Sequence, residues 1–110
     1  MGLEIVRVAD PPGFELIGEI DVSNADALDA ELQEWSQPND MTLDLSGLEF
    51  IDSSGIRILI DAIVRLRELD RTMILIDPIH SVERVFDILG LAAHGVEIRV
   101  AEGAHDRWPG

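Results

Sequence analysis

The sequence predicts an α/β domain with a mixed, mostly parallel sheet of four to five strands, a leading β-hairpin and three to four helices, in the order ββαβαβαβ. Three observations carry this prediction: short apolar segments typical of strands, amphipathic helical segments between them, and turn residues at the junctions. From the second strand onward, strands alternate with helices, which favours right-handed parallel crossovers. The 110 residues, 46% of them hydrophobic, suffice for one domain with a core. We place this domain at residues 1–100 and expect the aperiodic tail, residues 101–110, to fray.

The first half of the chain predicts a hairpin followed by a helix. Residues 3–8 alternate apolar and polar side chains as a half-buried strand does, and residues 10–13, Asp-Pro-Pro-Gly, form a turn. Residues 14–20 return as the second strand. Residues 21–24 then offer N-cap side chains for a helix. One face of that helix is apolar, formed by Ala25, Leu28, Leu32 and Trp35.

The second half predicts three further strands and two helices. Residues 41–45 form a buried strand, residues 72–76 a fourth strand and residues 96–100 a short last one. The helix that begins after the third strand has an inner stripe of Ile56, Leu59, Ile60, Ile63 and Leu66. Its outer stripe consists of Arg57, Asp61, Arg65 and Glu68, with Asp61 four residues before Arg65 in the order that favours an ion pair.

The last helix is predicted between the fourth and fifth strands. Ser81 is the expected N-cap, and Gly90 the expected residue at the end of the helix. The side chains expected in the core from this helix are Val82, Val85, Phe86 and Leu89.

Composition and charge exclude several classes of protein. The formal net charge is −14, which argues against general attraction to nucleic acid or anionic membranes and favours a basic protein surface as partner. Acidity that only keeps the protein soluble explains the charge equally well. The chain has no cysteine, no apolar run long enough to span a bilayer and no signal peptide at its start. We therefore expect a soluble cytoplasmic protein.

Acidic strand-to-helix turns mark the candidate site. Asp21 follows the second strand, and Asp52, Ser53 and Ser54 follow the third. If these strands are neighbours, both turns lie at the carboxyl edge of the sheet, where open α/β sheets carry their sites. A serine at a helix N-terminus lies beside free N–H groups that stabilise an anion. The segment therefore favours a phosphorylation switch over a catalytic centre.

Other interpretations of these residues remain open at this point. The two serines can be ordinary helix caps, and Asp21 can be a simple helix-entry residue. Asp21 and Asp52 can also be interpreted as a general acid/base pair or a Mg²⁺ site, although no substrate-pocket motif accompanies them. His80, His94 and His105 lack metal-ligand spacing, and no glycine motif for a nucleotide is present. We expect no cofactor and no bound metal.

Three segments together resemble the STAS domain (sulfate transporter and anti-sigma factor antagonist). They are GEID at residues 18–21 followed by Asn24-Ala25, LDLSGLEFIDSSG at residues 43–55, and DPIHSVERVFDILGL at residues 77–91. The similarity covers about residues 3–100. Asn24 stands where the family often has Thr, a change between two capping residues. Small free-standing members of this family are typically bacterial anti-sigma factor antagonists.

The resemblance implies a regulatory role without enzymatic activity. Ser53 matches the serine that is phosphorylated in these relatives. The anti-sigma factor phosphorylates it, because this partner is itself a serine kinase with a histidine-kinase-like ATPase fold. The unphosphorylated protein would bind this kinase and free the sigma factor, and a PP2C-type phosphatase would reset the switch. ATP and Mg²⁺ would belong to the kinase. The expected partner-binding residues are Asp21, Asp52, Ser53, Ser54, Gly55 and Arg57.

Two further functions fit the same family. The chain can be a STAS scaffold module of a sensory or lipid-transport complex, although no N-terminal sensor segment is evident. It can also be a module that binds a small ligand or nucleotide. The sequence does not assign a role to Trp108 in the tail.

Overall fold

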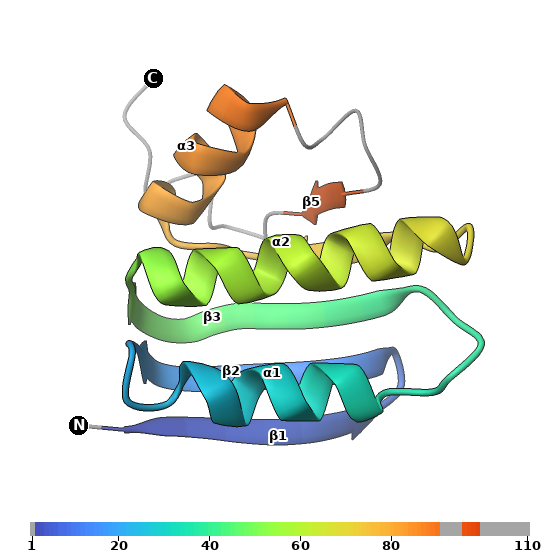
Figure 1. Cartoon of the computed structure of the whole chain (residues 1–110), viewed down its shortest axis with the longest axis horizontal. Helices are drawn as coiled ribbons and strands as arrows, with labels where there is room; N and C mark the ends of the chain where they lie inside the picture. Colours follow the sequence, from blue (N-terminus) through green and yellow to red (C-terminus); the bar gives the residue numbers. More distant parts are fainter. Residues whose placement is uncertain (1, 91–95, 100–110) are drawn as a thin grey trace.

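The computed structural model describes residues 2–90 and 96–99, and it confirms the predicted α/β fold. Five strands and three helices occur in these residues, in the order ββαβαβαβ (Figure 1). They are β1 (Leu3–Ala9), β2 (Pro12–Ile20), α1 (Ala25–Glu34), β3 (Met41–Ile51), α2 (Ser53–Glu68), β4 (Met73–Ile76), α3 (His80–Leu89) and β5 (Val96–Arg99).

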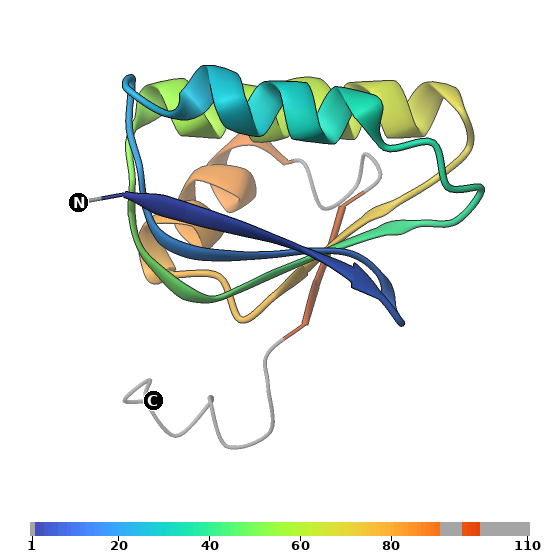
Figure 2. The same cartoon turned by 90° about the horizontal axis from the view of Figure 1, so that it is seen from below.

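The five strands form one sheet in sequence order. β1 and β2 pair antiparallel as the predicted hairpin, and β2–β3, β3–β4 and β4–β5 pair parallel. Figures 1 and 2 show α1 and α2 side by side over one face of this sheet. Because β2 and β3 are parallel neighbours, their carboxyl ends lie next to each other at one edge of the sheet.

The core lies between the sheet and its helices. α1 and α2 contribute Leu28, Leu59 and Ile63, all fully buried, as their apolar stripes predict. Ile56 and Ile60, predicted on the same stripe of α2, are half-buried. The sheet contributes alternate residues, as expected for strands with one face in a core. These include Phe14, Leu16, Leu43, Leu45 and Leu75.

β3 is longer than predicted. The sequence suggested a strand that ends at residue 45, but β3 continues to Ile51. Its pairing with β2 shifts register twice, between Glu15 and Ile17 and between Gly18 and Glu19. Such bulges let the strand continue through a segment whose apolar and polar residues do not alternate, which is why the pattern did not predict it.

Helix boundaries gave two confirmed predictions and one wrong one. α3 ends as predicted, because Gly90 takes the left-handed conformation with φ of 67°. Its N-cap is Ile79, however, so Ser81 lies within the first turn. Asn24 caps α1, but its side chain makes no capping hydrogen bond to the helix.

Two predictions about which helix residues are exposed and which are buried need correction. Arg65 is half-buried, and among the described residues it forms no ion pair with Asp61. Val85, predicted in the core, is also only half-buried, whereas Val82 and Phe86 are fully buried. The side chain of Leu89, residue 100 and the tail at residues 101–110 lie outside what the structure describes.

Candidate functional site

The candidate site lies where β2 and β3 end. Ile20 and Ile51, the last residues of these strands, are paired partners, and the Asp52 backbone N–H donates to the Ile20 carbonyl oxygen at 3.1 Å. Asp21 and Asp52 therefore follow paired residues on neighbouring strands. The prediction that the two acidic turns share one edge of the sheet is confirmed.

Asp52 is the N-cap of α2. Its Oδ1 atom accepts hydrogen bonds from the backbone N–H groups of Ser54 at 2.9 Å and Gly55 at 3.2 Å. The Ser54 hydroxyl donates to the same oxygen, and the Ile56 N–H donates to the Asp52 carbonyl at 3.0 Å. One carboxylate thus satisfies several of the donors that a helix start leaves open.

These hydrogen bonds lower the pKa of Asp52. The Ser54 hydroxyl is the largest cause, and the backbone N–H groups of Gly55, Ser54 and Val22 add to it, while partial burial acts in the opposite direction. Val22 belongs to the turn after β2, so a group of the neighbouring acidic turn also favours the charged form of Asp52. Asp52 is therefore a fixed negative charge at neutral pH.

The two serines of the turn differ in their surroundings. Ser54 is half-buried, and its hydroxyl is held by Asp52. Ser53, the first residue of α2, is exposed, and its hydroxyl has no hydrogen-bond partner among the described residues. Ser54 thus acts in the helix cap, whereas the Ser53 hydroxyl faces solvent.

Asp21 organises the neighbouring turn in a similar way. Its Oδ1 atom accepts from the backbone N–H of Ser23 at 2.9 Å and from the Ser23 hydroxyl. Asn24 accepts from the Asp21 N–H at 3.0 Å and donates through Nδ2 to the Glu19 carbonyl at 2.9 Å. These bonds fix the turn between β2 and α1 beside Ser53.

Gly55 allows α2 to begin close to the sheet. A Cβ atom at this position would lie 2.6 Å from Ile20 Cγ2 and 2.6 Å from Ile51 Cγ1, closer than real contacts allow. Gly55 is itself buried, so it supports the turn from below and offers no side chain to a partner. Arg57, one residue beyond Ile56, is exposed.

Exposed apolar side chains flank Ser53, and the sequence patterns did not identify them. Val22 is 79% exposed and Phe50 is 49% exposed. A shallow groove between the starts of α2 and α3 also borders Ser53 and is lined by Ile51, Asp52, Ser53, Ile56, Ser81 and Val85. The available signal was the position of two large apolar residues next to acidic ones: Val22 follows Asp21 in the turn after β2, and Phe50 follows Glu49 near the end of β3. We call Asp21, Val22, Phe50, Asp52 and Ser53 the serine edge.

Neither a metal cluster nor a membrane helix is found in the described part of the chain. Within residues 2–90 and 96–99, no group of three or more His, Asp or Glu side chains is placed to hold a metal ion. In the same residues, no helix is long and apolar enough to cross a bilayer.

Fold and site together define a small α/β domain with a capped serine turn at one edge of a mixed sheet. The family model of the STAS domain matches residues 4–102, and the chain belongs to this family. No curated protein matches the chain by sequence. The resemblance of the three sequence segments to STAS domains is thereby confirmed.

Solved structures of anti-sigma factor antagonists share the fold. The unphosphorylated form of SpoIIAA has a TM-score of 0.69 at 21% identity and covers 96% of both chains. The phosphorylated form of Bacillus SpoIIAA has a TM-score of 0.68 at 21% identity and covers 96% of this chain and 98% of its own. An anti-sigma-factor antagonist domain protein from Planctomyces limnophilus has a TM-score of 0.64 at 15% identity, with 93% of this chain and 92% of that one covered.

Proposed function

We propose that this protein is a bacterial, cytoplasmic anti-sigma factor antagonist that works without catalysis of its own. In this proposal the unphosphorylated protein binds an anti-sigma factor serine kinase, and phosphorylation of Ser53 releases it. A PP2C-type phosphatase restores the binding form. The observation that carries the proposal is the exposed, unbonded Ser53 hydroxyl beside the tightly bonded cap of Asp52 and Ser54.

The serine edge has the chemistry of a protein-binding surface. Val22 and Phe50 expose apolar area, and removal of this area from water by a partner would favour binding. Asp21, Asp52 and the exposed Arg57 offer charges around this area, and Ser53 offers a neutral hydroxyl within it. A kinase surface with complementary apolar and basic residues would bind here, and the overall charge of −14 would accelerate its approach.

A phosphate on Ser53 would act through local charge. It adds about −1.5 to −2 charges at neutral pH. The Ser54 and Gly55 N–H groups of the helix start already donate to Asp52, so they are not free to neutralise this charge. The phosphate would therefore remain an exposed anion that repels the neighbouring Asp52 carboxylate, and a partner surface that fits a neutral hydroxyl would have to desolvate this concentrated charge.

The fold would survive this modification. Ser53 is exposed at the first position of α2, and its hydroxyl supports no hydrogen bond in the described structure. The buried groups beneath it, Gly55, Ile20 and Ile51, need not move. Phosphorylation would then change binding while it leaves stability nearly unchanged.

Mass spectrometry tests the proposed site. The protein is incubated with ATP and a candidate cognate kinase, chosen as a histidine-kinase-like ATPase encoded beside it. We expect one phosphate on Ser53, none in Ser53→Ala, and wild-type modification in Ser36→Ala, which removes an exposed serine at the other end of the molecule. Modification that persists in Ser53→Ala would refute the site.

A further inference from the structure

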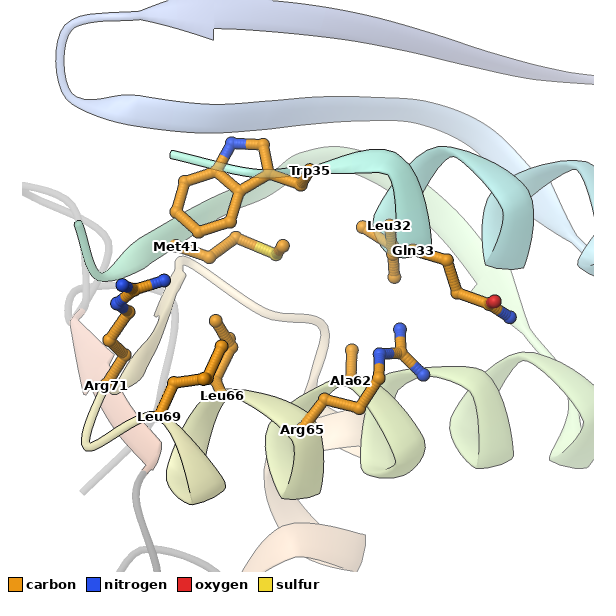
Figure 3. A pocket seen from close by; sticks show the side chains of 9 residues that line it. All are labelled: Leu32, Gln33, Trp35, Met41, Ala62, Arg65, Leu66, Leu69 and Arg71. Carbon is orange, nitrogen blue, oxygen red and sulfur yellow. The ribbon is translucent and has the colours of Figure 1, made fainter. Parts of the chain in front are cut away.

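A second candidate site lies at the opposite end of the sheet, between the carboxyl ends of α1 and α2. It is a hollow of about 140 Å³ formed where β3 begins. Figure 3 shows the side chains around it, with the Trp35 ring near Met41 and the Arg65 and Arg71 guanidinium groups on opposite sides. We call this hollow the arginine pocket; it is lined by Leu32, Gln33, Trp35, Met41, Ala62, Arg65, Leu66, Leu69 and Arg71.

The charge of this pocket is opposite to that of the protein as a whole. The chain has 22 acidic residues and 8 arginines, with no lysine. Two of those arginines line the pocket, and none of its nine lining residues is acidic. The two described ion pairs, Arg7–Glu31 and Arg99–Glu97, involve other arginines.

Arg65 carries a hydrogen-bond donor that the described protein does not satisfy. Its Nη2 atom is buried and has no hydrogen-bond partner among the described residues. A buried donor without an acceptor is costly, and more so when the group is charged. Because Arg65 also lines the pocket, a rotation of its side chain would turn this donor toward the hollow, where an oxygen acceptor would remove the cost.

Arg71 has donors available on the other side of the pocket. Its Nη1 atom donates to the Gln37 carbonyl at 3.1 Å, which anchors the guanidinium group. A guanidinium has five N–H donors, so this bond leaves others for a ligand. An anchored arginine also loses less conformational freedom when it binds.

The helix ends nearby explain part of this arrangement. α1 ends at Glu34 and α2 at Glu68, and helix carboxyl ends favour cations. Two carbonyl groups near the end of α2 are already bonded, since Leu69 and Arg71 donate backbone N–H groups to Leu66 and Asp70 donates to Arg67. The helix ends therefore account for arginines in this region, but they provide no acceptor for Arg65 Nη2.

The remaining walls select an apolar ligand body. Trp35 is half-buried, and Met41, Leu32 and Leu66 are buried, so one side of the hollow is aromatic and aliphatic. A cavity of about 150 Å³ with apolar walls holds a benzene-sized molecule. The pocket therefore fits one small ring or branched chain.

We propose that the arginine pocket binds a small organic acid, with an aromatic or branched apolar body against Trp35 and its carboxylate on Arg65, while Arg71 across the hollow adds positive charge. This inference goes beyond the proposed function and does not depend on Ser53. Benzoate has the required size and charge, and benzyl alcohol is a neutral compound of similar shape.

The test measures benzoate binding to the full chain by titration of Trp35 fluorescence, with Trp108→Phe as the background so that one tryptophan remains. We expect saturable binding with a Kd of about 1 mM or lower. Benzyl alcohol should bind about tenfold more weakly, because it lacks the charge that strengthens a hydrogen bond to arginine.

Arginine variants locate the site. Arg65→Gln should weaken benzoate binding about tenfold or more, and Arg71→Gln should also weaken it, so either can serve if the other alters folding. Arg67→Gln is the matched control, since it removes an exposed arginine from the same turn of α2 outside the pocket lining. Absence of saturable binding, equal affinity in Arg65→Gln, or equal losses in Arg65→Gln and Arg67→Gln would each overturn the proposal.

Discussion

The two ends of β3 and α2 differ in how their polar groups are satisfied. At the serine edge, Asp52 Oδ1 accepts hydrogen bonds from the Ser54 and Gly55 N–H groups and from the Ser54 hydroxyl, whereas the Ser53 hydroxyl is exposed and has no partner among the described residues. At the arginine pocket, the Nη2 donor of Arg65 is buried and finds no acceptor in residues 2–90 and 96–99. The same two elements thus form a hydrogen-bonded helix start at one end and border a buried charged donor without an acceptor, among the described residues, at the other.

This difference separates two ways in which a structure indicates function. A hydroxyl that supports no contact can be modified at little cost to the fold, so the serine edge suits a reversible covalent switch. A buried donor without an acceptor favours the binding of a ligand that supplies an acceptor, so the arginine pocket suits non-covalent binding. Substitutions at one end of the molecule test the interpretation of that end without affecting the other.

The largest expected effect is that of Ser53→Asp on kinase binding. A fixed negative charge beside Asp52 should weaken the complex about 100-fold, because the kinase surface that fits the neutral Ser53 hydroxyl would have to desolvate a charge that it does not pair. Calorimetric titration with the kinase measures it. The melting temperature should change by less than about 2 °C, since Ser53 is exposed. Ser36→Asp, with the same charge change at the other end, should bind as wild type does; an equal loss there would point to net charge instead.

The next effect concerns the apolar part of the serine edge. Phe50→Ser should weaken kinase binding about tenfold while stability changes little, because Phe50 is 49% exposed and aromatic residues often dominate interfaces. Leu69→Ser is the control, since Leu69 is 59% exposed and lies at the arginine pocket. If both variants bind the kinase equally well, Phe50 lies outside the interface.

Gly55→Ala tests the packing beneath Ser53. The added Cβ would meet Ile20 and Ile51 at 2.6 Å, so we expect a loss of about 1–3 kcal/mol in the free energy of unfolding. Denaturant unfolding measures this loss. Gly2→Ala, where no atom lies within 4 Å of the added Cβ, should have no effect. An unchanged stability in Gly55→Ala would show that α2 can shift away from the sheet.

The smallest expected effect is the pH dependence that Asp52 contributes. Its pKa is lowered from 3.8 in the folded protein, so the unfolded chain takes up a proton first as pH falls. The stabilisation is therefore complete above about pH 4 and is lost as pH falls through the folded pKa. Asp52→Asn should melt below wild type at pH 7, and the gap in melting temperature should narrow below pH 4. A gap that stays constant with pH would contradict this role.

Much of the site could be predicted because it depends on strand order and local capping. Asp21 and Asp52 share an edge since their strands are parallel neighbours, and alternation of strands and helices predicts that arrangement. The pattern of acid, serine, serine and glycine likewise predicts a helix start, and Asp52 caps α2. Both inferences use only short stretches of sequence.

The rest depends on contacts that local patterns do not contain. In β3, Leu48 and Ile51 are buried while Glu49 and Phe50 are both exposed, because register shifts break the alternation that would predict which residues face inward. Arg65 has Asp61 in an ideal position on its own helix, but α1 packs against α2 and the guanidinium lines the pocket between them. Only the tertiary structure shows that the Arg65 side chain lines the pocket instead of pairing with Asp61.

The most direct test of the central claim compares amide NMR spectra of the protein with and without phosphate on Ser53, alongside kinase binding. Shift changes should be confined to the serine edge and the first turn of α2, and the phosphorylated protein should fail to bind the kinase. Changes that extend to Trp35 and Arg65 at the far end, or undiminished binding after phosphorylation, would contradict a switch that acts through local charge alone.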